Sequence, residues 1–362
     1  MKILFLSRTV KNGGDFLYAG RAKEILKHNL PYAEIVCRHM LDEVDLPYIN
    51  SFDKIIISGG PLYDDRFLTS NATPCFAFLD KMKPTIHFFG VGWYGENAFM
   101  KTIYTYRFHE EVLANLRLIE KKGGTFSCRD YITAKVLRNN GLNHVYMTGC
   151  PAWYDLKFLP CMSLKKTSIQ NVKNLVISDM GMTKDSSYHS IKIEQVKKLV
   201  EFIESTFSQA NIVFTFNGGV DTKYSGEFNR AVCKYLGKKH IMWHDLSGSM
   251  DGFHVYDNID LHIGYRVHSH IYCLSHRIPT ILIEEDARGA GINQALGLPA
   301  IQNYNFDTVG RFQENPFLFL ELMNYIEELD CESMNRIQLA VLRMATIYSR
   351  TVQPYIQDVF GV

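Results

Sequence analysis

One short stretch of the chain concentrates side chains that could do chemistry. Arg266, His268 and His270 fall within five residues, directly after an apolar run that ends at Gly264. Arginine supplies a fixed positive charge, and histidine changes its protonation state near neutral pH. The stretch therefore predicts anion binding or proton transfer, with His268 as an acid or a base. His270 lies deeper in the helix expected here, which favours a place in the core.

Two further arginines follow apolar runs elsewhere in the chain. Arg129 comes directly after Thr125–Cys128, and Arg288 comes after Thr280–Ile283 and the acidic residues Glu284, Glu285 and Asp286. The arginine fork suits a carboxylate or a phosphate. A surface pair with Asp130 is the alternative for Arg129, and a solvated loop is the alternative for Arg288. Together, the cations predict a small substrate with several negative charges. The three acidic residues are weaker acid or base candidates.

Glycine follows an apolar run in four places, namely Asn12–Asp15, Ser58–Pro61, Gly90–Trp93 and Asn217–Gly219. Such turns can expose backbone N–H groups to an anion at the start of a helix. We expect this of Gly13, Gly14, Gly59, Gly60, Gly90 and Gly92, with an ordinary strand-to-helix turn as the alternative. None of the turns has the spacing of a dinucleotide-binding or Walker loop, which disfavours those two classes of protein.

The sequence gives little support to a metal site. His268 and His270 could chelate, but no carboxylate or cysteine stands at a familiar ligand spacing. The eight cysteines are scattered and form no C-x-x-C pair. We therefore expect no metal and no disulfide framework, and reduced thiols fit a cytoplasmic protein.

The elements that must position these residues alternate along the chain. In the first half, strands are expected at Lys2–Ser7, Ile55–Ser58, Thr85–Gly90, Thr125–Cys128 and Val145–Thr148, and helices at Phe16–Asn29 and Tyr131–Asn139. In the second half, strands are expected at Asn174–Ser178, Ile212–Phe216, Ile241–Trp243, Leu261–Ile263 and Thr280–Ile283, and helices at Lys192–Phe207 and Val267–Leu274. Continuous apolar strands between helices indicate parallel sheets that are covered on both faces.

This pattern predicts an α/β protein with two Rossmann-like, doubly wound domains that face a cleft, as in the GT-B architecture. The first domain is expected over residues 1–158 and the second over 172–330, with a linker around Leu156–Lys173 and a closing helical segment over 331–362. Ligands of such sheets bind beyond the carboxyl ends of the strands, so the cleft is the expected site.

The amino-acid composition limits the kinds of molecule that this protein is expected to bind. Of the 362 residues, 46% are hydrophobic and 21% are charged, with a net charge of +1. A globular protein is expected, without the charge of a nucleic-acid coat or a polybasic membrane anchor. No apolar run has the length of a membrane span. We expect a cytoplasmic protein and leave open a peripheral contact with the inner face of the membrane.

The order and spacing of these motifs resemble the polysaccharide pyruvyl transferases, which move the enolpyruvyl unit of phosphoenolpyruvate onto a sugar as a ketal. The resemblance runs from about residue 2 to 300. It is carried by Asn12–Asp15, Ser58–Pro61, Gly90–Gly92, Ser127–Asp130, Thr148–Pro151, Gly264–His268, Arg288 and Gly291–Leu298.

The resemblance implies a site for phosphoenolpyruvate made by Arg129, His268 and Arg288, with Arg266 close by. It implies no cofactor and no metal. The second domain would hold the donor and the first a sugar acceptor that is lipid-linked, nucleotide-linked or polymeric. Asp15 is our candidate base for the acceptor hydroxyl, and capping of the helix from Phe16 is its alternative role.

Two residues depart from the family pattern. Cys150 stands where the family usually has aspartate, which puts the role of that carboxylate in doubt. Arg288 stands where lysine is common, and arginine keeps the charge but cannot readily donate a proton. A wall of aromatic side chains for the acceptor is a further expectation, with the protein core as its alternative, at Phe67, Trp93, Tyr94, Tyr104 and Tyr106.

Two other functions stay open at this point. A nucleotide-sugar glycosyltransferase would use the same architecture and cleft. However, the Glu-x7-Glu motif is absent here, because Ile292 and Asn293 stand where a second glutamate would follow Glu284 or Glu285. A non-catalytic relative in polysaccharide assembly would explain the lost aspartate at Cys150. The retained Arg129, Arg266 and His268 argue against it.

Overall fold

The computed structural model describes residues 1–165, 167–181, 189–221, 226–306 and 312–362. The first half of the chain forms a parallel six-stranded sheet in the order β2-β1-β3-β4-β5-β6. Its strands are β1 (Lys2–Ser7), β2 (Glu34–His39), β3 (Lys54–Ser58), β4 (Thr85–Val91), β5 (Thr125–Cys128) and β6 (Val145–Met147). Central strands such as β3 are buried and continuously apolar, since helices cover both of their faces. The edge strand β2 is half exposed and polar, and its sequence did not predict a strand.

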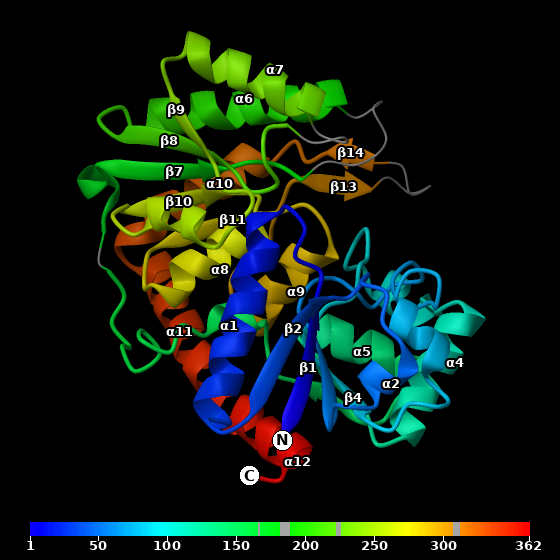
Figure 1. Cartoon of the computed structure of the whole chain (residues 1–362). Coiled ribbons are helices and arrows are strands. Elements are labelled where there is room, and N and C mark those ends of the chain that lie inside the picture. The colour runs from blue at the N-terminus through cyan, green and yellow to red at the C-terminus, as the bar shows by residue number, and fades with distance from the viewer. Residues whose placement is uncertain (166, 182–188, 222–225, 307–311) are drawn as a thin grey trace.

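The second half forms another parallel six-stranded sheet, in the order β12-β11-β10-β7-β8-β9. Its strands are β7 (Asn174–Ser178), β8 (Asn211–Phe216), β9 (Met242–Asp245), β10 (Leu261–Gly264), β11 (Thr280–Glu284) and β12 (Ile301–Gln302). A two-stranded ribbon follows, made of β13 (Tyr304–Phe306) and β14 (Phe312–Glu314). The expected pair of Rossmann-like domains in a GT-B-like arrangement is thereby confirmed (Figure 1).

Helices cover both sheets and close the chain. They are α1 (Gly13–Asn29), α2 (Leu46–Ile49), α3 (Met100–Thr105), α4 (Glu110–Lys121), α5 (Tyr131–Asn139), α6 (His189–Thr206), α7 (Gly226–Lys238), α8 (Val267–Ser275), α9 (Ala287–Leu296), α10 (Leu318–Glu327), α11 (Glu332–Ile347) and α12 (Gln353–Phe360). Within the described ranges, no helix combines the length and the hydropathy that crossing a membrane requires.

Helix α1 begins earlier than its sequence predicts. Asn12 is its N-cap, and the Asn12 side chain accepts a hydrogen bond of 2.8 Å from the N–H of Gly14. Asp15 therefore lies in the first turn of the helix. The alternative that Asp15 itself caps this helix is wrong, because Asn12 already does so and Asp15 has helical backbone.

The C-terminal helices return to the first domain, where both chain ends lie (Figure 1). On α12, the hydroxyl of Tyr355 donates to the carbonyl of Phe88 at 2.6 Å and lies 3.1 Å from the hydroxyl of Thr125. Its ring stacks on Phe89 with 6.0 Å between centroids. The last helix thus completes the core beneath β4 and β5.

Backbone hydrogen bonds join the two domains at the ends of their strands. The N–H of Gly13 donates to the carbonyl of Asn217, and the N–H of Gly248 to the carbonyl of Lys11, both at 2.8 Å. The strand order reverses between β1 and β3 in one sheet and between β7 and β10 in the other. These reversals are the places where open α/β sheets bind ligands. The segments after β1 and β10 meet in this structure, so the fold brings the two places together.

Candidate active site

A cavity of about 60 Å³ lies where the two domains meet. Among the residues that line it are all five charged or titratable residues predicted for the site, namely Asp15, Arg129, Arg266, His268 and Arg288. Its other lining residues are Asn12, Pro61, Asn217, Tyr265, Val267, Glu285, Asp286 and Gly289. Segments that are up to 273 residues apart in the sequence (residues 15 and 288) therefore share one site.

Arg129 is the most deeply buried cation of the cavity, with 2% of its surface exposed. It follows β5, and its Nε lies 3.3 Å from the carboxylate of Asp130. Asp130 is also the N-cap of α5, where it accepts from the N–H of Thr133 at 2.6 Å. The Nη2 atom of Arg129 has no hydrogen-bond partner among the described residues. The pairing with Asp130 is thus present, but Arg129 is buried and does not lie on the surface. A buried, unsatisfied guanidinium nitrogen at a cavity favours an anionic ligand.

Arg266 is held by a buried carboxylate that the sequence analysis missed. Asp179 follows β7 and is 1% exposed, and its Oδ1 accepts from Nε of Arg266 at 2.7 Å. Asp179 also accepts from the N–H of Asn217 at 3.0 Å. The pair fixes the guanidinium at the cavity wall and offsets part of its charge. An aspartate directly after a buried strand was the signal that could have identified Asp179.

Arg288 lies in the first turn of α9, and the alternative of a solvated loop is wrong. Asp286 is the N-cap of this helix and accepts from both the N–H and the Nε of Arg288, at 2.9 and 2.8 Å. The ring of Tyr94 lies 5.5 Å from the guanidinium. Although burial opposes it, the Asp286 carboxylate raises the pKa of Arg288, which therefore stays charged.

His268 lies in the first turn of α8 and is half buried. Its ring centroid is 5.7 Å from that of Tyr18. Burial, together with the charges of Arg129, Arg288 and Arg266, lowers the pKa of His268 to about 3. The imidazole is therefore neutral at physiological pH while no anion is bound.

Asp15 has the opposite shift. Burial raises the pKa of this carboxyl to about 7, although Arg8, Arg288 and Arg266 act to lower it. At neutral pH both of its protonation states are populated, which suits a group that gives or takes a proton. Arg8 was not identified from the sequence, although it follows β1 directly.

Arg129, Arg266, His268 and Arg288, the residues on which the family resemblance placed the donor site, thus line one cavity. A family model of the polysaccharide pyruvyl transferases matches residues 12–286, which is most of the chain. This chain belongs to the polysaccharide pyruvyl transferase family. A search of curated proteins finds no match.

Solved structures are similar to this pyruvyl transferase family member in fold. The S. aureus MnaA–UDP co-structure has a TM-score of 0.57 at 12% sequence identity, and the match covers 98% of this chain and 96% of that one. UDP-GlcNAc 2-epimerase from Neisseria meningitidis, bound to UDP-GlcNAc, has a TM-score of 0.54 at 11% identity, with 99% and 100% covered. At such low identity, these likenesses show the fold alone.

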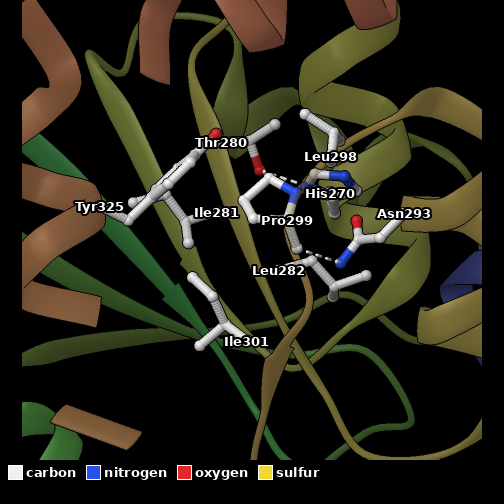
Figure 2. Close-up of a pocket in the computed structure, with 9 residues that line it drawn as sticks. All are labelled: His270, Thr280, Ile281, Leu282, Asn293, Leu298, Pro299, Ile301 and Tyr325. Carbon is white, nitrogen blue, oxygen red and sulfur yellow. Dashed lines mark hydrogen bonds between the residues drawn. The ribbon is translucent and has the colours of Figure 1, made fainter. Parts of the chain in front are cut away.

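His270 lies away from the site, as the sequence predicted. Its Nδ1 is 2.9 Å from the hydroxyl of Thr280, and both residues line a small cavity of about 10 Å³ beside β11 (Figure 2). His268 and His270 therefore do not chelate one ion together. Among the described residues there is no group of three or more His, Cys, Asp or Glu side chains placed to hold a metal.

The glycine turns serve close packing. A Cβ atom at Gly14 would overlap the imidazole of His268, and one at Gly92 would overlap the guanidinium of Arg129. Five of the glycine N–H groups already have acceptors within the protein, at 2.8 to 3.0 Å. The pairs are Gly13 with Asn217 O, Gly14 with Asn12 Oδ1, Gly59 with Phe89 O, Gly90 with Ser127 Oγ, and Gly92 with Gly60 O. We therefore no longer expect these five N–H groups to bind an anion. The glycines let the functional side chains pack against the backbone instead.

The remaining acidic candidates differ in their positions. Glu285 lines the cavity and accepts from the N–H of Gly181 at 2.7 Å. Glu284 lies outside the residues that line this cavity and accepts from the Asn293 side chain at 2.8 Å. Burial raises the pKa of both carboxyls, that of Glu284 to about 7. Glu285 is thus the nearer of the two to the chemistry.

Cys150 is buried, and burial raises the pKa of its thiol to about 11. The position where the family usually carries aspartate therefore holds an uncharged group here. The charge of Arg129 acts on this thiol, which places the two side chains near each other.

None of the five aromatic residues expected to form an acceptor wall lines the cavity. Trp93 is 2% exposed and packs edge-on against Tyr106, with 5.1 Å between centroids. Phe67 and Tyr94 lie against arginine side chains, and Tyr104 is exposed beside Lys135.

Proposed function

We propose that this chain transfers the enolpyruvyl group of phosphoenolpyruvate to a sugar of a surface polysaccharide or its precursor, as a pyruvate ketal, and releases phosphate. The observation that carries the proposal is the buried Arg129, whose Nη2 lacks a partner among the described residues and lines a cavity shared with Arg266, His268 and Arg288. Phosphoenolpyruvate carries a carboxylate and a phosphate, which these cations match. Family membership supports the same donor.

The reaction needs one proton on the methylene carbon of the donor and two new bonds to its central carbon. Protonation turns the methylene into a methyl group and leaves an oxocarbenium-like centre. One sugar hydroxyl attacks this centre, and a second hydroxyl replaces the phosphate. Of the two hydroxyl protons released, one balances the proton given to the methyl group and the other leaves with phosphate. The site must therefore supply an acid and a base, or one group that serves as both.

His268 and Asp15 fit these two tasks. His268 is neutral in the empty site because burial, and then the charges of three arginines, lower its pKa. A bound trianion would reverse the sign of the local field and raise the pKa of His268, so that the imidazolium could protonate the methylene carbon. Asp15, whose pKa is about 7, is the proposed base for the sugar hydroxyl. The donor lies on the side of the second domain and the acceptor on the side of the first.

The test is a calorimetric titration of the protein with phosphoenolpyruvate. We expect saturable binding that His268→Ala weakens at least tenfold. Because the bound donor is expected to protonate His268, the apparent enthalpy should depend on the ionisation enthalpy of the buffer. Absence of phosphoenolpyruvate binding by the wild-type protein would overturn the proposal.

A nucleotide-sugar glycosyltransferase is the second candidate, because the structures similar in fold include complexes with UDP and UDP-GlcNAc. UDP-sugars and GDP-sugars belong in the same titration. Binding of a nucleotide sugar without any binding of phosphoenolpyruvate would favour this candidate. Binding of neither ligand would favour a non-catalytic relative in polysaccharide assembly.

A further inference from the structure

Arginine and aromatic side chains alternate in a row that ends at Arg288, a residue that lines the cavity. The Arg8 guanidinium carbon lies 3.8 Å from the centroid of the Phe67 ring. The guanidinium of Arg66 lies 5.1 Å from the same ring and 4.5 Å from that of Tyr94, and the guanidinium of Arg288 lies 5.5 Å from the Tyr94 ring. The row thus runs from the first domain to Arg288 in the second domain, which lines the cavity.

Two of the three arginines in this row have a built-in counter-ion. Asp64 accepts from the N–H and the Nε of Arg66 at 2.8 and 2.7 Å, and Asp286 accepts from the same atoms of Arg288 at 2.9 and 2.8 Å. Each aspartate stands two residues before its arginine. The charges of Arg66 and Arg288 are therefore partly offset within the protein.

Arg8 has no such partner. In the part of the chain that the structure describes, its guanidinium makes no ion pair and no hydrogen bond, and the Phe67 ring is its close contact. Arg8 is nevertheless half buried, and burial lowers its pKa. The charges of Asp15 and Asp64 act on Arg8, but neither carboxylate bonds its guanidinium, so the fork is open to a ligand anion.

Arg8 also lies on the acceptor side of the site. It follows β1, in the first domain, and its charge acts on Asp15, the proposed base for the sugar hydroxyl. The cations proposed for the donor reach the cavity from other strand ends, namely β5, β10 and β11. A sugar whose hydroxyls lie at Asp15 would thus come near Arg8.

We propose that Arg8, supported by Phe67 and Arg66, forms a second anion site that binds the diphosphate of a diphosphate-linked sugar acceptor. This inference rests on the proposed function and deepens it, because it selects a phosphorylated precursor over a finished neutral glycan. The free arginine fork can take two phosphate oxygens at once, while the ring holds its plane. Such a diphosphate is found in nucleotide-linked and lipid-linked sugars alike.

The test is titration of inorganic diphosphate into the protein with phosphoenolpyruvate at saturation. Wild type should bind diphosphate, and Arg8→Ala should weaken that binding at least tenfold while changing the affinity for phosphoenolpyruvate less than twofold. Arg8→Lys should give an intermediate loss, since lysine keeps the charge without the fork. Arg38→Ala is the matched control, because Arg38, on β2, also lies against an aromatic ring, 5.6 Å from that of Tyr48. This variant should bind diphosphate like wild type.

UDP and farnesyl diphosphate, used as further probes, distinguish the two sources of the diphosphate. Tighter binding of UDP indicates a nucleotide-linked acceptor, and tighter binding of farnesyl diphosphate a lipid-linked one. The inference is overturned if the wild-type protein binds no diphosphate. It is also overturned if Arg8→Ala weakens the binding of phosphoenolpyruvate as much as the binding of diphosphate. If phosphoenolpyruvate fails to bind while Arg8-dependent diphosphate binding persists, the proposed donor fails and the anion site stands.

Discussion

Gly14 of the first domain lies directly against the imidazole of His268 in the second domain. A Cβ atom at this glycine would overlap Nδ1 of the ring. Since Gly14 is in the first turn of α1 and His268 in the first turn of α8, the contact ties two helix starts together across the domain boundary. The position of the proposed acid is therefore set by both domains.

This contact makes Gly14→Ala a sharp test of the site. The methyl group must displace the imidazole or separate the two helices, and we expect kcat to fall at least tenfold and stability to fall by about 1–3 kcal/mol. Gly20→Ala on the same helix is the control, because its Cβ would meet only the flexible side chain of Met250. Activity and thermal unfolding of both variants check the prediction, and equal activity in the two would contradict it.

Removing Arg129 should weaken donor binding without unfolding the chain. Loss of one charge-assisted contact costs on the order of 1.5–3 kcal/mol, which corresponds to a Kd for phosphoenolpyruvate raised roughly 10- to 150-fold in Arg129→Ala. We expect the same direction for Arg288→Ala. Arg117→Ala, which removes an exposed arginine of α4, is the control for charge alone. Wild-type affinity in both site variants would refute the donor site.

His268 and His270 offer a matched pair of histidines two residues apart. His268→Ala should abolish transfer and leave the unfolding free energy nearly unchanged. His270→Ala should keep the donor affinity but lose on the order of 1–3 kcal/mol of stability, because it removes a buried imidazole and one of the two histidine hydrogen bonds at the Thr280 hydroxyl. Calorimetric titration and urea unfolding of each variant separate the two roles, and an exchange of these outcomes would reverse our assignment.

The raised pKa of Asp15 gives a prediction for the pH profile. A base must be ionised, so kcat/KM should rise with pH through a midpoint near 7, the pKa of Asp15 in the free protein. Asp15→Asn should lose this limb together with most of the activity. A pH profile of wild type that stays flat between pH 6 and 8 would exclude Asp15 as the base.

The same shift links Asp15 to stability. Because the folded chain binds this proton more tightly than the unfolded chain, the stability that the Asp15 carboxyl contributes is full below pH 4 and is lost as pH rises toward 7. Asp15→Asn should therefore match wild type at pH 4 and exceed its unfolding free energy at pH 7.5. The gain should be on the order of 2 kcal/mol, about half the full linkage value because the group faces a solvent-filled cavity. Urea unfolding at the two pH values measures it.

Much of the fold was predictable because buried parallel strands are continuously apolar. The expected strand Asn174–Ser178 matches β7 residue for residue, and the expected helix Tyr131–Asn139 matches α5. The edge strand β2 was missed because one of its sides faces solvent and its residues include Glu34 and Arg38. Pattern alone cannot separate such a strand from a loop.

The five charged or titratable residues of the site were predictable because each follows a strand end or begins a helix, and parallel strands end at one edge of their sheet. Their partners were harder to predict. Asp179 contacts Arg266 from another strand, 87 residues earlier in the sequence, and only the strand order β7–β10 brings them together. Arg8 belongs to none of the motifs in the sequence. Its significance depends on its guanidinium having no hydrogen bond and no ion pair in the described fold.

The return of α12 to the first domain has a consequence for how the protein is made. Tyr355, which anchors this helix beneath Phe88 and Thr125, follows the whole second domain in the sequence and is therefore synthesised after it. In the sequence, the second domain thus lies between two parts of the first domain. The first domain therefore cannot complete its core until synthesis has passed residue 355. We expect ribosome-bound chains to acquire protease resistance in the second domain before the first.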